Sequence, residues 1–228
     1  MSGVLDGRTA IVTGGGRGIG AAAARALSAL GARVTVFART GEEIARVVAA
    51  GDASLAVEGD VSREDDVARL VAGHLDALGP CDVLVNNAGV LERGRVEALE
   101  PAAWRRVLEV NLTGAYLCTR AVVPQMRRRR AGRIVNVASI SGTLGTPEAS
   151  AYNASKWGLI GFTKSLAEEL RGDGVQVMSV SPGSVDTRML RGTSFAPAMT
   201  SEDVAKVIAW CAAEAPDAMT GANVEVFG

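Results

Sequence analysis

A tyrosine and a lysine four residues apart offer the clearest chemistry in this sequence. They open and close the segment Tyr152-Asn153-Ala154-Ser155-Lys156, and on a helix this spacing places the phenol and the ammonium on one face, a turn apart. A free tyrosine has a pKa of about 10, too high for a base near neutrality. A nearby cation favours the phenolate and lowers that pKa. The pair is therefore suited to proton transfer at a carbonyl or hydroxyl oxygen.

A glycine-rich loop near the start of the chain is suited to a phosphate group. The loop, Thr13–Gly20, links an apolar run to a helix-like stretch. Glycines let the backbone approach a pyrophosphate, and the helix that follows offers free N–H groups. The spacing Gly14-x3-Gly18-x-Gly20 is neither G-x-G-x-x-G nor a Walker loop. Alone it is equally compatible with a structural turn. Together with the tyrosine and lysine it indicates hydride and proton transfer at a carbonyl.

The end of the second apolar run indicates which dinucleotide would bind. NAD-preferring sites usually place a carboxylate about twenty residues past the loop, on the ribose 2′-hydroxyl. Here Ala38 stands at the end of the run and Arg39 follows it. Arg39 can clamp a 2′-phosphate with forked hydrogen bonds, and Arg17 in the loop can add a second positive charge. The sequence predicts NADP(H) over NAD(H); the alternative is an Arg39 that points into solvent.

Strand-like and helix-like stretches alternate along the chain and must position these groups. The predicted strands are 9–13, 33–37, 54–57, 82–86, 133–138, 175–180 and 223–227, and the predicted helices are 18–30, 41–50, 63–78, 101–129, 152–171 and 201–214. Several strands are apolar without alternation, as in strands covered on both faces. Ser62 and Ser201 resemble helix N-caps because acidic residues follow them. The alternation predicts a Rossmann-like α/β fold, with a doubly wound parallel sheet and helices on both faces.

The length, composition and net charge of the chain argue against several classes of protein. The 228 residues are 48% hydrophobic and 21% charged, which fits one large domain, 1–228. A net charge of −1 argues against a nucleic-acid partner held by overall charge. No apolar run approaches the ~20 residues of a membrane span, so no membrane partner is expected. Met1–Gly7 lacks the basic start and apolar stretch of a signal peptide.

The cysteines and other metal-binding residue types give no sign of a metal. Cys81, Cys118 and Cys211 are widely spaced and form neither a zinc pattern nor a disulfide framework. Reduced thiols in a cytoplasmic protein are expected. No cluster of His, Cys, Asp and Glu has the spacing of metal ligands.

Further motifs follow in a fixed order and carry a resemblance. Asp60-Val61 follows the third strand, Asn86-Asn87-Ala88-Gly89 closes the fourth, Asn111 lies in the long helix, Ser139 ends the fifth strand, and Pro182-Gly183 with Thr187 follows the sixth. With the glycine loop and the Tyr-x3-Lys pair, this set resembles the short-chain dehydrogenase/reductase family nearly end to end, and its 3-oxoacyl-[acyl-carrier-protein] reductase-like members in particular. The resemblance implies about seven strands in the order 3-2-1-4-5-6-7.

The resemblance also implies an activity and a role for each residue. The enzyme would interconvert a ketone or 3-oxoacyl substrate and a secondary alcohol with NADP(H). Tyr152 would be the acid or base, Lys156 would tune it and hold the nicotinamide ribose, and Ser139 would bond the substrate oxygen. Asn111 would hold a water that links Lys156 to solvent. The predicted cofactor contacts are Gly14, Gly16, Arg17, Gly18, Ile19, Gly20, Arg39, Asp60, Val61, Asn87, Ala88, Gly89, Tyr152, Lys156, Pro182, Gly183, Val185 and Thr187.

Two other functions fit parts of the sequence. A dinucleotide-binding sensor without turnover would share the fold, but such relatives typically lose the tyrosine or the lysine. A serine hydrolase would need a base, and His74 is the only histidine and lies away from every motif. A surface or packing role is expected for it. No Gly-x-Ser-x-Gly surrounds Ser139.

Two surface features predict partners. The run Arg127–Arg130 either ends a helix in solvent or, with Arg171, docks an acidic partner such as an acyl carrier protein. The small residues Ala154, Gly158, Gly161 and Ser165 form a stripe on one helix. The stripe either packs inside one subunit or, as the resemblance implies, pairs subunits into a dimer or tetramer.

The chain departs from the family's pattern where substrates bind. The segment 188–200 is shorter than the helical lid of many relatives, which predicts a more open pocket or one completed by another subunit. The expected pocket wall consists of residues 90–95, 140–150, 184–185 and 188–199. Its polarity is mixed and does not identify a substrate. The end of the chain lacks the Asp-Gly-Gly common in the family.

Overall fold

The strands form a parallel sheet at the centre of the molecule. The structure is a computed structural model that describes residues 3–191, 193 and 195–228. Over these residues seven strands pair in the order β3-β2-β1-β4-β5-β6-β7, all in parallel. They are β1 (Thr9–Thr13), β2 (Arg33–Ala38), β3 (Leu55–Glu58), β4 (Val83–Asn86), β5 (Gly132–Val137), β6 (Val175–Pro182) and β7 (Asn223–Val226). The predicted doubly wound fold and strand order are confirmed.

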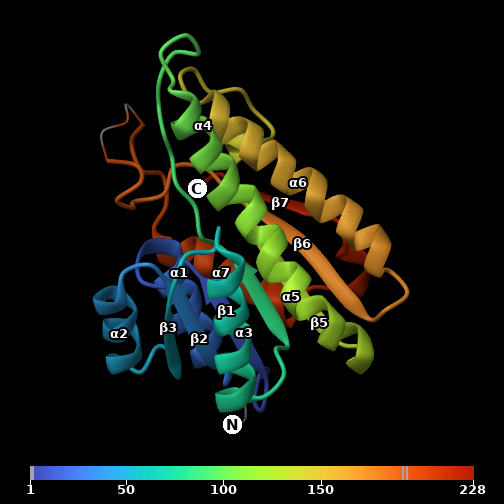
Figure 1. Cartoon of the computed structure of the whole chain (residues 1–228). Coiled ribbons are helices and arrows are strands. Elements are labelled where there is room, and N and C mark those ends of the chain that lie inside the picture. The colour runs from blue at the N-terminus through green and yellow to red at the C-terminus, as the bar shows by residue number, and fades with distance from the viewer. Residues whose placement is uncertain (1–2, 192, 194) are drawn as a thin grey trace.

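Helices cover both faces of the sheet (Figure 1). They are α1 (Gly18–Ala29), α2 (Gly41–Ala49), α3 (Glu64–Leu78), α4 (Pro101–Leu108), α5 (Gly114–Arg129), α6 (Ser150–Leu170) and α7 (Ser201–Ala213). Val12 of β1 packs in one core with α1, α2 and α7, whereas its neighbour Ile11 packs in the other with α3, α5 and α6. Successive side chains of a strand point to opposite faces. Both faces are buried, which explains the unbroken apolar run.

The predicted helix 101–129 is interrupted. A π-helical turn, Glu109–Thr113, separates α4 from α5. A π turn widens the helix by a residue and often marks a functional site. It leaves little trace in the sequence, because the apolar spacing on either side stays helical.

Each predicted N-cap is wrong by one residue: Ser62 lies one residue before the observed cap and Ser201 one residue after it. Ser62 instead donates its hydroxyl to Asp60 (2.7 Å), and α3 begins after Arg63. The cap of α7 is Thr200, whose hydroxyl accepts a hydrogen bond from the Asp203 backbone N–H (3.2 Å) while the Asp203 carboxylate accepts one from the Thr200 N–H. This reciprocal pair satisfies two backbone donors at the helix start.

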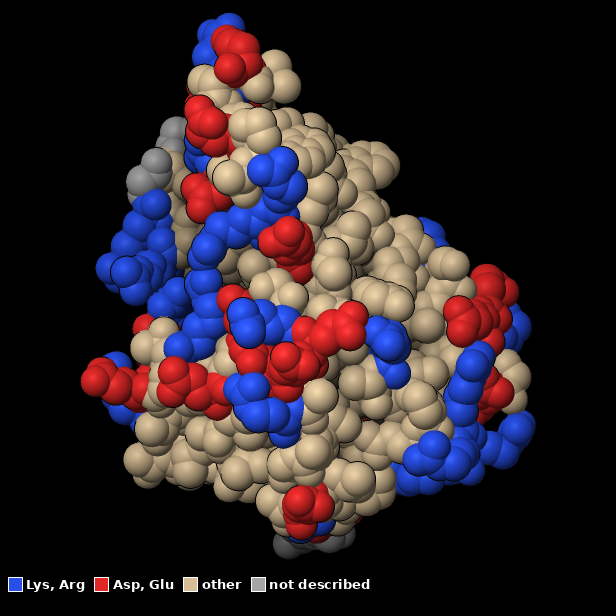
Figure 2. Space-filling view, in the orientation of Figure 1, with Lys and Arg blue, Asp and Glu red and all other residues tan. Residues whose placement is uncertain are grey.

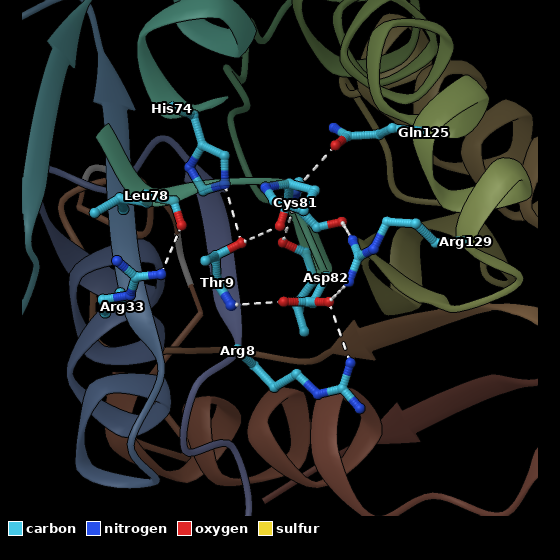
Figure 3. A network of polar contacts seen from close by, with 11 residues as sticks. Arg8, Thr9, Arg33, His74, Leu78, Cys81, Asp82, Gln125 and Arg129 are labelled. Carbon is cyan, nitrogen blue, oxygen red and sulfur yellow. Dashed lines mark hydrogen bonds and ion pairs between the residues drawn. The ribbon is translucent and has the colours of Figure 1, made fainter. Parts of the chain in front are cut away.

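His74 lies in a buried polar network at the amino ends of the strands (Figure 3). The Thr9 hydroxyl donates to the Pro80 carbonyl (2.6 Å), so it must accept from His74 Nε2 (3.1 Å). Nδ1 therefore accepts from the Thr35 hydroxyl (2.8 Å). Burial lowers the pKa of His74 to about 4. The prediction was a surface or packing role, and the structure shows packing, because the side chain is fully buried. This network lies at the opposite end of the sheet from the predicted catalytic residues.

The cysteines Cys81, Cys118 and Cys211 are buried and unpaired, and burial raises the pKa of each thiol. Over the described part of the chain, no helix is long and apolar enough to cross a membrane. Within the same residues, no group of three or more His, Cys, Asp or Glu side chains is placed to hold a metal ion.

Candidate active site

A cavity of about 1300 Å³ lies along the carboxyl ends of the strands. Every predicted cofactor and catalytic residue lines it except Gly20 and Asn111. Its wall runs from Arg39, after β2, to Ser139, after β5. Three strand spacings separate β2 from β5 in the sheet, which is about 14 Å. The cavity is long enough for an extended dinucleotide, and this edge of a doubly wound sheet is where such ligands bind.

The glycine loop fits a pyrophosphate. Gly14 has a φ of 65°, and a Cβ there would lie 2.9 Å from the Ala88 Cα. A Cβ on Gly20 would lie 2.2 Å from the Gly14 carbonyl oxygen, so Gly20 serves the packing of the loop rather than the cavity wall. A Cβ on Gly18 would lie 3.4 Å from a Thr187 methyl group and 4.0 Å from the Ser201 hydroxyl. Gly18 and Ile19, at the start of α1, line the cavity, and the free N–H groups of a helix start suit a phosphate.

Thr13 joins the glycine loop to the segment after β4. Its hydroxyl accepts hydrogen bonds from the backbone N–H groups of Asn87 (3.0 Å) and Ala88 (3.1 Å). The Asn87 side chain donates back to the carbonyls of Thr13 (3.0 Å) and Gly14 (3.2 Å). These bonds hold two parts of the cavity wall in one geometry. The sequence places both segments in motifs, but the hydrogen bonds that join them, over seventy residues apart, carry no sequence signal.

The two arginines predicted to face a 2′-phosphate have different surroundings. Arg17 forms an ion pair with Glu43 of α2, at 2.8 and 3.0 Å, a partner that the sequence did not reveal. The contact of Arg39 with Asp60 is long, at 4.0 Å, and the arginine side chain is 48% exposed. Its guanidinium therefore remains the better placed of the two to bind an added anion at the cavity edge.

Lys156 is held inside the protein. Its side chain is 4% exposed and its Nζ donates to the Val137 carbonyl at 2.8 Å. Nζ lies 5.6 Å from the centre of the Tyr152 ring, as the helical spacing predicted. Burial lowers the pKa of Lys156 to about 8. Ser139, at the end of β5, is 8% exposed, and its hydroxyl accepts from the Ser141 N–H at 3.1 Å.

The pKa of Tyr152 differs from the expectation. Burial raises it, and a hydrogen bond with Ser139 only partly opposes that rise. Lys156 does not contribute the lowering of the Tyr152 pKa that the sequence predicts. The physical reason is desolvation, which disfavours the phenolate and also weakens Lys156 as a cation. A phenol that stays protonated suits an acid that donates a proton.

Asn111 lies in the π turn and ties two walls of the site together. Its side chain accepts from the Val90 N–H (2.8 Å) and donates to the Val90 carbonyl (2.9 Å) and the Ser155 hydroxyl (3.0 Å). Ser155 in turn donates to the Tyr152 carbonyl at 2.7 Å. Asn111 is 1% exposed and does not line the cavity. The link through Ser155 was missed, although that serine lies within the Tyr-x3-Lys segment.

The predicted basic docking run is largely engaged within the chain. Arg127 pairs with Asp173 at 2.6 Å, Arg129 pairs with Asp82, and Arg130 donates to the Gly172 carbonyl at 2.9 Å. Arg171 pairs with Glu168 of its own helix. These contacts favour the helix-end interpretation over the docking interpretation.

The small-residue stripe on α6 is divided between two environments. A Cβ on Gly158 would lie 2.8 Å from a Leu112 methyl group, so this glycine allows close packing inside the subunit. A Cβ on Gly161 would meet nothing within 4 Å. Trp157 on the same helix is 54% exposed, and Tyr116 on α5 is 45% exposed. Part of the stripe thus remains on an exposed, partly aromatic face.

The fold and this cavity define a nucleotide-binding protein of the doubly wound α/β class. A sequence model of the short chain dehydrogenase family matches residues 8–197. The 3-oxoacyl-[acyl-carrier-protein] reductase of Synechocystis is 39% identical over 85% of this chain and 80% of the relative. A 3-alpha-(or 20-beta)-hydroxysteroid dehydrogenase of Mycobacterium bovis is 39% identical over 100% of this chain and 91% of the relative.

A solved structure has the same architecture. The 3-ketoacyl-(acyl-carrier-protein) reductase of Brucella melitensis, complexed with NADH, superposes with a TM-score of 0.93, at 32% identity, over 98% of both chains. The chain belongs to the short-chain dehydrogenase family. It is therefore an oxidoreductase that acts on CH–OH and C=O groups with a nicotinamide nucleotide cofactor.

Proposed function

We propose that this protein is an NADP(H)-dependent reductase that interconverts a ketone, including 3-oxoacyl substrates, and a secondary alcohol, with Tyr152 as the acid or base. The supporting observation is that Ser139, Tyr152 and Lys156 line the part of the cavity beside β5, whereas Arg39 lines the part beside β2. A cofactor bound between them supplies or accepts the hydride. The residues of the chain supply the proton and hold the reacting oxygen.

Each side chain has a distinct task in this proposal. In reduction the protonated Tyr152 donates its hydroxyl proton to the carbonyl oxygen. The Ser139 hydroxyl donates a hydrogen bond to the same oxygen, where negative charge develops. Lys156 is held by Val137 and orients the nicotinamide ribose. Asn111 fixes Val90 and Ser155 and so holds the wall in place. In oxidation Tyr152 accepts the proton, which the positive charge of an oxidised nicotinamide ring favours.

The substitution Tyr152→Phe tests this function. NADPH oxidation would be followed by absorbance over a panel of ketones, diketones, quinones and 3-oxoacyl thioesters. The variant should bind NADPH normally, measured by fluorescence, and lose roughly a hundredfold or more of its turnover, because a positioned acid contributes that much. Tyr116→Phe is the matched control, since this second tyrosine is exposed and does not line the cavity.

Retained turnover in Tyr152→Phe would remove the proton-transfer role. Wild-type protein that binds NADPH and reduces no member of the panel would instead favour a sensor of the cofactor.

A further inference from the structure

The mouth of the cavity carries an arginine that the catalytic roles do not use. Arg93 lies between β4 and α4 and lines the cavity. Its guanidinium carbon lies 5.8 Å from the centre of the Phe195 ring, which belongs to the segment after β6. Gly94, the next residue, donates its N–H to the Glu148 carbonyl at 2.9 Å, just before α6. Arg93 is thus held where three walls of the substrate pocket meet.

The charges of this part of the wall are unbalanced. The basic side chains beyond the cofactor loops are Arg93, Arg106, Arg188 and Arg191, and the acidic ones are Glu92 and Asp186. Over the described residues, no ion pair joins any of these six. By contrast Arg17 and Glu43 neutralise each other nearer the cofactor loop. Figure 2 shows basic side chains gathered beside the segment after β6 and below α4.

Apolar side chains line the same cavity as this arginine and the catalytic groups. Leu144, Met189 and Phe195 line the same cavity and are 55%, 40% and 48% exposed. The wall therefore presents polar groups for a carbonyl at Ser139 and Tyr152, exposed apolar surface, and an exposed cation at Arg93. A molecule with a ketone, a short carbon skeleton and an anionic end matches these groups.

We propose that the substrates are oxo acids and their hydroxy acids, and that Arg93 binds their carboxylate. The inference rests on the proposed function, because it takes Tyr152 and Ser139 as the groups that hold the carbonyl. A guanidinium presents two parallel N–H groups that match a carboxylate. The Phe195 ring stabilises the cation through its face and limits the positions it adopts. Phe195 is thus a positioning residue for Arg93.

Paired substrates test the proposal directly. The probes are 4-oxopentanoate, 5-oxohexanoate and 6-oxoheptanoate, each beside its methyl ester. In wild type the best acid should exceed its ester in kcat/KM by roughly tenfold, the value of one charge-assisted hydrogen bond. In Arg93→Ala that preference should disappear through a higher KM for the acid, with kcat and the ester little changed. The preference should also shrink in high salt, because Arg93 is exposed.

Arg95→Ala is the matched control. Arg95 lies two residues further along, pairs with Glu97 at 2.6 Å and does not line the cavity. This variant should keep the preference for the acid. A higher KM for NADPH in Arg93→Ala, equal with acid and ester, would assign Arg93 to the cofactor and overturn the proposal.

Binding without turnover separates this proposal from the proposed function. Calorimetry with Tyr152→Phe and NADPH should show tighter binding of the acid than of its ester, and the further change Arg93→Ala should remove the difference. Equal binding of acid and ester would overturn the proposal, even if esters are reduced rapidly by wild type. If the acid bound more tightly than its ester but no ketone were turned over, the carboxylate site at Arg93 would be upheld. The proposed reductase function would then fail.

Discussion

Arg39 and Arg17 both face the edge of the cavity where a 2′-phosphate would lie, but they are not equivalent. Arg17 is engaged by the Glu43 carboxylate at 2.8 Å. An added phosphate would have to compete with this carboxylate for the same guanidinium. Arg39 has its nearest carboxylate, Asp60, at 4.0 Å. Discrimination between the two dinucleotides should therefore depend mainly on Arg39.

Arg39→Ala should lower the ratio of kcat/KM for NADPH to that for NADH by roughly tenfold or more, because charge-assisted hydrogen bonds to the 2′-phosphate are lost. The activity with NADH should change little. Arg46→Ala is the control, since Arg46 is exposed on α2 and does not line the cavity. The measurement is steady-state kinetics with each cofactor at one ionic strength. An unchanged ratio in Arg39→Ala would contradict a preference for NADP(H) set by this residue.

The helix that carries Tyr152 and Lys156 is positioned by a short 3₁₀ turn. This turn, Ile140–Gly142, directly follows Ser139. A Cβ on Gly142 would lie 2.9 Å from the Lys156 carbonyl oxygen and 2.6 Å from an Ile160 methyl group. The absence of a side chain therefore lets α6 approach Ser139 closely. The positions of Ser139, Tyr152 and Lys156 relative to one another therefore depend on the contact between α6 and this 3₁₀ turn.

Gly142→Ala should displace α6 from the turn. Turnover should fall roughly tenfold to a hundredfold, because small misplacements of reacting groups are costly, and the free energy of unfolding should fall by about 1–3 kcal/mol. Gly73→Ala, inside α3, is the control. A Cβ there meets nothing within 4 Å, so its stability should be unchanged or up to about 1 kcal/mol higher. Kinetics and urea unfolding measure both. Equal effects of the two substitutions would contradict the role of Gly142.

The sequence predicts the elements better than the contacts between them. The apolar segments of β1 and β5, which lack polar alternation, predict buried parallel strands, and the ordered motifs predict the cavity wall. The π turn at Glu109–Thr113 is invisible because it shifts hydrogen-bond partners without changing the residue pattern. The pairing of Arg17 with Glu43 and the raised pKa of Tyr152 were also missed. Both depend on distances and burial that only the assembled fold defines.

In the whole molecule, the two ends of the sheet have separate tasks. The carboxyl ends of the strands line the cavity. At the amino ends, Asp82 is 7% exposed and accepts hydrogen bonds from the Thr9 N–H (2.9 Å), Arg8 and Arg129 (Figure 3). A buried carboxylate paired in this way fixes the strand starts and is costly to disturb. Substitutions at that end should therefore affect stability rather than chemistry.

The outer face of α5 and α6 remains exposed and partly aromatic. Tyr116 and Phe162 meet edge to face at 6.4 Å between ring centres, and Trp157 lies 54% exposed on α6. Gly161, also exposed, leaves room for a second backbone to approach. We infer that two copies of the chain pair through this face, since a symmetric pair buries the same surface on both subunits.

Wild-type protein should therefore have the mass of at least two chains by light scattering at micromolar concentration. Trp157→Glu should shift it toward the mass of one chain, because a charge would be buried without a partner in the interface. Val96→Glu is the control, since Val96 is 78% exposed and belongs to the segment between β4 and α4 rather than to α5 or α6. A wild-type mass of one chain would contradict the dimer. If both substitutions dissociated the protein equally, the interface would lie elsewhere on the molecule.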